Sequence, residues 1–264
     1  MQIIPSEELS NSDYHKLPAI SSSAVKAVAT STLHHWKNVT FNTTPAMILG
    51  SAFHAMVLEP EKNLVHDSGL PRRGSKAWKE QEEFLGEDEI LLPTGEYEQC
   101  KKMVDGCLQN KIARKVLTDK DMLAEYSFIA TCPETGLELK CRPDGLLDGA
   151  GIVLDLKTCL DASYHGFEKT IRNYRYDLQA CFYRYVLKLC EIPTTNFIFI
   201  ATEKNSYATA CYEMSDKYNQ YAEDEMFKTL RKIKVAQDTN TYDTGWPDLE
   251  TVHLPPWLDE NHGL

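Results

Sequence analysis

The residues best suited to chemistry lie in one stretch, residues 138–157, which reads E-L-K-C-R-P-D-G-L-L-D-G-A-G-I-V-L-D-L-K. Asp144 is followed by Asp155 and then, after one residue, by Lys157. Side chains alternate between the faces of a strand, so Asp155 and Lys157 point to one face and Leu156 to the other. Two carboxylates can bind a hard cation through oxygen. A lysine beside them can orient a water that the cation polarises.

A short β-hairpin would place these groups. Residues 137–142 alternate as a strand, residues 148–151 have the glycine-rich chemistry of a turn, and residues 151–157 form an apolar second strand. Such a hairpin returns Asp144 to the side of Asp155. A surface hairpin with an ordinary ion pair is the alternative, because D-x-K is a common pattern. Charges at the end of an apolar strand are costly unless they are paired or bound to metal, which favours a cation site.

Two helical segments add polar groups. Residues 47–58 read M-I-L-G-S-A-F-H-A-M-V-L, an apolar helix in which His54 lies one turn after Gly50. His54 is either a core histidine or a neutral imidazole ligand, and Gly50 would then allow another backbone to approach closely. In the later helix Gln179 shares a stripe with Tyr176 and Tyr183, and an amide in that position needs a partner. Gln179 either bonds to backbone or meets a phosphate or a metal-bound water.

Glu125 is a further acidic residue, near the start of a predicted strand over residues 123–131. It is either an extra carboxylate near a metal or an exposed strand residue.

Taken in order, these segments resemble the PD-(D/E)xK nuclease superfamily, in its RecB-like branch. The matching positions are Gly50, His54, Asp144, Asp155, Lys157, Gln179 and Tyr183. The serines at 21–23, the run L-G-S-A-F-H-A-M-V-L-E-P at 49–60 and the closing L-P-P-W at 254–257 are also similar to the nuclease domain of RecE-type exodeoxyribonucleases (exonuclease VIII).

The resemblance implies a restriction-endonuclease-like α/β core, with a mixed central sheet flanked by helices and extra N-terminal helices. It implies a Mg²⁺-dependent exonuclease that degrades one strand of linear double-stranded DNA in the 5′→3′ direction and leaves 3′ single-stranded tails for recombination. The alternatives are a 3′→5′ exonuclease, an endonuclease or an inactive DNA-binding module. A ring-shaped homotetramer and a single-strand annealing recombinase of the RecT type as partner are implied in the same way.

In such a site His54, Asp144, Asp155 and the backbone carbonyl of Leu156 would hold one or two Mg²⁺ ions. The histidine makes Mn²⁺ an alternative. Lys157 would orient or deprotonate the attacking water. Gln179 would position the phosphate or the nucleophile, with support from Tyr183.

Composition limits the remaining choices. A chain of 264 residues with 42% hydrophobic and 25% charged residues fits one globular domain over 1–264, with an extended lead-in at 1–20 and an irregular tail at 240–264 whose tryptophans pack on the body. No apolar run reaches the ~20 residues of a membrane helix and no signal peptide is evident, so we expect a cytoplasmic protein without a membrane partner.

Charge and cysteine content add two expectations. A net charge of −11 argues against a protein that coats nucleic acid, but a nuclease needs only local basic surface. Three short basic clusters are candidates, at 72–79, 111–115 and 169–175. The eight cysteines lack metal-binding spacing, and the cysteine pattern of iron–sulfur relatives is absent after Cys211. We therefore predict reduced, buried cysteines and no iron–sulfur cluster.

Overall fold

A five-stranded mixed sheet with the order β10-β9-β8-β7-β4 is the centre of the fold. The computed structural model describes residues 1–38 and 43–254. Strands β8 and β9 run parallel, and the other neighbours in this sheet are antiparallel. The five strands are β4 (Leu123–Ala124), β7 (Gly145–Leu147), β8 (Ile152–Cys159), β9 (Asn196–Glu203) and β10 (Thr209–Tyr212). The predicted mixed sheet flanked by helices is thus confirmed.

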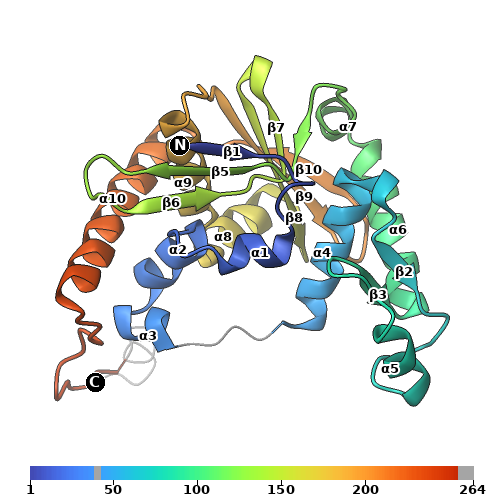
Figure 1. The fold of residues 1–264 in the computed structure, drawn as a ribbon, viewed down its shortest axis with the longest axis horizontal. Helices are drawn as coiled ribbons and strands as arrows, with labels where there is room; N and C mark the ends of the chain where they lie inside the picture. Colours follow the sequence, from blue (N-terminus) through green and yellow to red (C-terminus); the bar gives the residue numbers. More distant parts are fainter. Residues whose placement is uncertain (39–42, 255–264) are drawn as a thin grey trace, which may run out of the picture.

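Helices cover both faces of this sheet (Figure 1). One face carries α4 (Pro45–Leu58) and α6 (Thr94–Gln109). The other carries α8 (Tyr164–Tyr174) and α9 (Tyr176–Leu189), which connect β8 to β9, and α9 is backed by α10 (Asp216–Thr239). A parallel strand pair needs such a crossover. Because helices cover both faces of the sheet, strand β8 carries apolar side chains on both faces. Val153 packs into one core, whereas Leu154 and Leu156 pack into the other.

The ends of α4 and the junction between α8 and α9 each have a local cause in the chain. Thr44 caps α4 through its side chain, Pro45 occupies the first turn, and the helix ends at the residue before Glu59-Pro60. Helix α8 ends and α9 begins at Arg175, which has a left-handed backbone with φ 51°.

The predicted hairpin is wrong in one of its strands. Residues 137–142 do not pair with β8; β6 (Glu138–Cys141) pairs instead with β5 (Ser127–Thr131), and β1 (Gln2–Ile4) completes a separate three-stranded sheet. The chain bends after Cys141, and the partner of β8 is β7. The Arg142 guanidinium donates to the Ser127 hydroxyl over 2.7 Å, which ties the end of β6 to β5.

The first twenty residues are not an extended lead-in. They contain β1 and the helix α1 (Asn11–Lys16). The buried ammonium of Lys140 donates to the carbonyls of Tyr14 (2.6 Å), His15 (3.3 Å) and Leu17 (2.8 Å) at the end of α1. Carbonyls at a helix end lack partners within the helix, so one lysine from β6 supplies them and holds α1 against the body.

The remaining elements surround this centre. The predicted extra N-terminal helices are present. These are α1, α2 (Ser22–Thr30) and α3 (Leu33–Asn38). The other peripheral elements are α5 (Lys76–Glu82), α7 (Lys111–Leu117), β2 (Val65–Asp67), β3 (Ile90–Leu92) and two 3₁₀ turns at Pro60–Lys62 and Asp148–Ala150.

The burial of the cysteines and of the tail tryptophans can be compared with the predictions. Seven of the eight cysteines are buried and Cys211 is partly buried. In the tail Trp246 is 73% exposed, so the prediction that it packs on the body is wrong, and Trp257 lies outside the described residues. Across residues 1–38 and 43–254, no helix combines the length and apolarity needed to cross a membrane.

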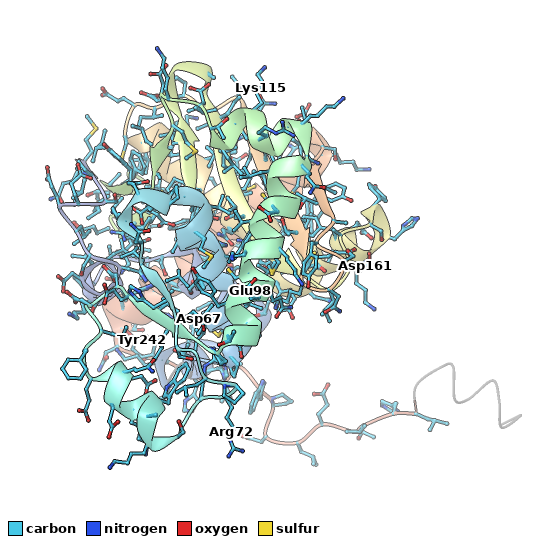
Figure 2. The ribbon with its side chains drawn as sticks, turned by 90° about the vertical axis from the view of Figure 1, so that its right-hand side faces the viewer. Asp67, Arg72, Glu98, Lys115, Asp161 and Tyr242 are labelled. Carbon is cyan, nitrogen blue, oxygen red and sulfur yellow. The ribbon has the colours of Figure 1, made fainter. Side chains whose placement is uncertain are left out.

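The three basic clusters do not gather on one surface. Arg72 lies beside α5 and Lys115 lies on α7 at the opposite end of the molecule (Figure 2). Arg73 is paired with Glu96, and Arg175 with Asp177. These clusters do not form one continuous basic face.

Candidate active site

Asp144 and Asp155 lie next to each other on neighbouring strands. Gly145 is the register partner of Leu154, which brings the residue before β7 opposite Asp155. Oδ2 of Asp144 accepts a hydrogen bond from the backbone N–H of Leu156 over 2.5 Å. The hairpin therefore returns Asp144 to Asp155 as predicted, although a different strand does so.

Asp155 is fully buried between two side chains. Its Oδ1 is paired with the ammonium of Lys157, and its Oδ2 accepts from Nε2 of Gln179 over 2.6 Å. Burial raises the pKa of Asp155, and Lys157 opposes that rise. Burial alone would lower the pKa of Lys157, but Asp155 and Asp144 outweigh it and raise that pKa. Asp155 and Lys157 share a face as predicted, and Leu156 points into the opposite core.

His54 faces a carboxylate. Its Nδ1 lies 3.5 Å from Oδ1 of Asp144. Burial would lower the pKa of His54, but the Asp144 carboxylate outweighs burial and raises it. The expectation for Gly50 is corrected: a Cβ there would lie 3.6 Å from the Thr158 hydroxyl, an ordinary contact with a side chain and not a close approach of another backbone.

Glu125 joins this group from an unexpected backbone position. It lies in the bend between β4 and β5 with φ 55°, so the single strand predicted over 123–131 is in fact two strands. Ligand atoms of Glu125, His54 and Asp144 all lie within 4.8 Å of one another, and this group can hold a metal ion. Burial and the Asp144 carboxylate raise the pKa of Glu125 to about 8. Of the two alternatives, the structure favours the extra carboxylate.

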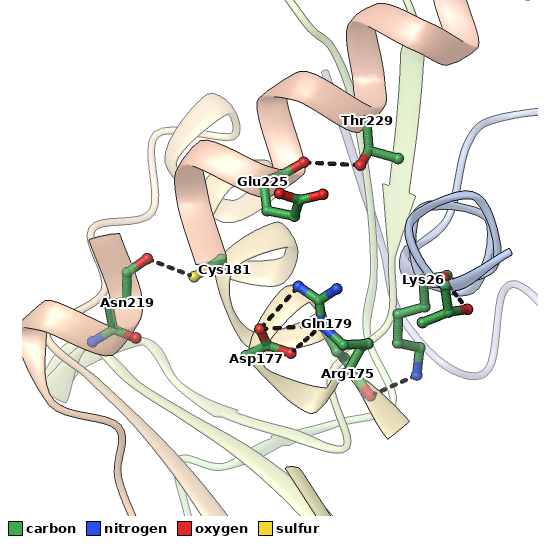
Figure 3. A network of polar contacts seen from close by, with 9 residues as sticks. Lys26, Arg175, Asp177, Gln179, Cys181, Asn219, Glu225 and Thr229 are labelled. Atoms are coloured by element: carbon green, nitrogen blue, oxygen red, sulfur yellow. Dashed lines mark hydrogen bonds and ion pairs between the residues drawn. The ribbon is translucent and has the colours of Figure 1, made fainter. Parts of the chain in front are cut away.

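Lys26 is a polar neighbour that the sequence analysis missed. Its ammonium donates to Oε1 of Gln179 over 3.3 Å (Figure 3). Lys26 and Asp155 therefore hold the two ends of one amide. Because a lysine can only donate, it fixes the oxygen of Gln179 toward itself and the nitrogen toward Asp155. One signal was available: Lys26 is the only charged residue within Ser22–Thr30.

A cavity of about 360 Å³ opens beside these groups. His54, Glu125, Asp144 and Tyr183 line it, and Arg142 lies on its wall. The structure thus brings His54, Asp144, Asp155, Lys157 and Gln179 into a continuous set of contacts, with Tyr183 at the cavity. The catalytic and ligand roles predicted for them, and for the Leu156 carbonyl, stay predictions.

A family model described as a PDDEXK-like domain of unknown function (DUF3799) matches residues 10–245. The chain belongs to this family. Within that PDDEXK-like domain, Asp155 and Lys157 lie on β8, the middle strand of the central sheet, and Asp144 directly precedes β7. No curated protein was found to match the chain.

One solved structure shares the fold of this chain over nearly its whole length. A protein from Eubacterium rectale, named as a candidate exonuclease, superposes with a TM-score of 0.65 at 16% identity, over 99% of this chain and 98% of that chain. A second structure, SSO0001, has a TM-score of 0.30 at 13% identity over 71% of this chain and 87% of that chain, which is too low to argue from. At these identities the first likeness shows the fold.

Proposed function

We propose that this protein is a Mg²⁺-dependent exonuclease that degrades one strand of linear double-stranded DNA in the 5′→3′ direction and leaves 3′ single-stranded tails. The observation that carries the proposal is the contact set Asp144, Asp155 and Lys157, with His54 and Glu125 beside it. Membership of a PDDEXK-like family and the fold shared with a candidate exonuclease support it. The direction and the product rest on the resemblance to RecE-type nucleases.

The residues present fit a hard divalent cation. Two carboxylates and an imidazole with ligand atoms within 4.8 Å form a compact, mostly oxygen donor set. Glu125, Asp144 and His54 would hold the cation, with Asp155 and the Leu156 carbonyl as the further predicted ligands. Bound Mg²⁺, or Mn²⁺ in its place, would polarise the phosphate and activate a water.

The protein's own groups have separable tasks in this proposal. Lys157 presents an ammonium at the Asp155 carboxylate and can donate to a phosphate oxygen or orient the attacking water. Gln179 donates to Asp155 and holds one of its oxygens, so it acts through that carboxylate as a positioning residue. Tyr183 lines the cavity one turn after Gln179 on α9 and would support Gln179 there.

The test compares linear duplex DNA labelled at the 5′ or the 3′ end with a closed circle. We expect early release of the 5′ label, slow loss of the 3′ label and an intact circle. Early release of the 3′ label would indicate the opposite polarity, and nicking of the circle would indicate an endonuclease. Binding without product from any substrate would indicate an inactive module.

A variant completes the test. Asp155→Ala should abolish nucleotide release, whereas Asp216→Ala, at the exposed start of α10, should leave it unchanged. Release by purified Asp155→Ala at the wild-type rate would contradict the proposed mechanism.

Assembly and partner belong to the same proposal, on the strength of the resemblance alone. We expect a ring of four copies, which sedimentation velocity would report. We also expect binding to a RecT-type annealing recombinase, which co-purification of the two proteins would report.

A further inference from the structure

The junction between α8 and α9 is strained and firmly held. Arg175 has φ 51°, a left-handed conformation that is strained for a residue other than glycine. Its guanidinium pairs with the buried carboxylate of Asp177, with Nε 3.1 Å from Oδ1 and Nη2 3.2 Å from Oδ2 (Figure 3). Strain that is fixed in this way suggests that the bend serves a purpose.

The bend brings two tyrosines together. Residues two apart on a continuous helix do not face each other. Across Arg175, however, the rings of Tyr174 and Tyr176 are stacked, with centroids 5.7 Å apart and planes at 20°. Tyr176 stacks in turn on Phe199 of the core, at 6.2 Å and 28°. The stack therefore runs from the core to the surface, where Tyr174 is 63% exposed.

The inner part of this stack touches the candidate active site. The Lys157 ammonium lies 4.6 Å from the centroid of the Tyr176 ring, and the Lys26 ammonium lies 5.4 Å from it. Lys157 is also the partner of Asp155. The exposed ring of Tyr174 is thus one ring removed from the lysine and carboxylate of the site, and both ammonium groups lie at the Tyr176 ring between them.

An exposed aromatic ring beside cations matches the chemistry of a nucleic-acid strand. Proteins bind single strands by placing cations along the phosphates and aromatic rings against the bases. The Lys157 ammonium, beside Tyr176 and paired with Asp155, suits a phosphate oxygen at the site, and the outer part of the Tyr174 ring is open. A nucleotide accounts for both features, because its phosphate matches the Lys157 ammonium and its base matches the Tyr174 ring.

We propose that Tyr174 stacks on a nucleobase of the strand being hydrolysed, close to the scissile phosphate. The proposal rests on the proposed nuclease function and adds a base-binding subsite to it. It implies that the enzyme holds the reacting nucleotide by its phosphate at Lys157 and holds a neighbouring base by its ring.

The experiment uses Tyr174→Ala, Tyr174→Phe and the control Tyr164→Ala. Tyr164 is a similarly exposed tyrosine, 66% accessible, at the other end of α8. The substrates are linear duplexes in which one abasic nucleotide is moved along the degraded strand. We measure KM and kcat with Mg²⁺, and DNA binding by fluorescence anisotropy with Ca²⁺ replacing Mg²⁺.

We expect Tyr174→Ala to raise KM by about five- to a hundredfold, the range for loss of one base–aromatic stack. Tyr174→Phe should stay within about twofold of wild type because it keeps the ring, and so should Tyr164→Ala. In wild type, an abasic nucleotide at one position should raise KM by a similar factor. In Tyr174→Ala that position should carry no extra penalty, because the partner ring is already gone.

The outcomes separate the two proposals. An abasic penalty that is the same in wild type and Tyr174→Ala overturns the subsite while nuclease activity stands. Wild type that releases no nucleotide overturns the nuclease function, and the anisotropy measurements then decide whether the base contact exists. If Tyr174→Ala unfolds, as judged by circular dichroism, Tyr174→Leu with the same abasic series takes its place.

Discussion

Gln179 donates a 2.6 Å hydrogen bond to Asp155, and this contact links α9 to the end of β8. The same amide accepts from Lys26 on α2 over 3.3 Å. One side chain on α9 thus connects β8 with α2, which comes much earlier in the chain. The position of the Asp155 carboxylate therefore depends on α9, which carries Gln179, and on α2, which carries Lys26.

Replacing Gln179 with Ala should reduce kcat by about ten- to a hundredfold, the usual effect of losing a partner of a metal-site carboxylate. The buried Asp155 would keep only Lys157, and its already raised pKa would rise further. Higher pH should therefore restore part of the activity in Gln179→Ala, more steeply than in wild type. Gln220→Ala, on the exposed side of α10, is the control. Parallel pH profiles for wild type and Gln179→Ala would contradict this role.

Metal binding should release protons at pH 7. The pKa of Glu125 is raised to about 8, so this carboxyl holds a proton at pH 7, and the Asp144 carboxylate raises the pKa of His54 above its ordinary value. Ligation requires the deprotonated forms. Titration of Mn²⁺ in two buffers of different ionisation enthalpy would measure the release, which should diminish toward pH 9. Glu125→Gln should bind metal at least tenfold more weakly and release fewer protons; equal release by the two proteins would refute the assignment.

Lys26 should make stability depend on alkaline pH. Burial and the nearby Lys157 lower its pKa from 10.5 to about 8. Below pH 8 the folded protein carries a partly buried charge at a cost. Between about pH 8 and 10.5 only the unfolded chain keeps the proton, so the free energy of unfolding should rise with pH. Lys26→Met should lack this rise, and exposed Lys169→Met should keep it. Urea midpoints from pH 7 to 10 provide the measurement.

Two glycines of α6 should respond oppositely to alanine. A Cβ on Gly106 would lie 2.0 Å from the backbone oxygen of Tyr207, so Gly106→Ala should destabilise the fold by about 1–3 kcal/mol through overpacking. A Cβ on Gly95 would meet nothing within 4 Å, and alanine there should stabilise by up to about 1 kcal/mol. Thermal denaturation of both variants checks this pair. A neutral Gly106→Ala would show that the approach of Tyr207 is not rigid.

Local sequence was sufficient for several parts of the site. Alternation along β8 placed Asp155 and Lys157 on one face, and helical spacing placed Gln179 and Tyr183 on one stripe of α9. The apolar helix with His54 was equally plain, with a proline near each end. These patterns succeed because side-chain direction within one element follows from its period alone.

What the sequence determined was therefore most of the chemical groups and, for His54, Asp155, Lys157 and Gln179, the element that carries each one. Tertiary structure decided which strand returns Asp144 to Asp155, because β6 pairs with β5 and leaves β7 for β8. It also decided that the left-handed bend at Glu125 turns a carboxylate toward His54, and that Lys26 reaches Gln179 across 153 residues of chain. Strand pairing and contacts between distant helices depend on the packing of the whole core, and no period within a single segment encodes them.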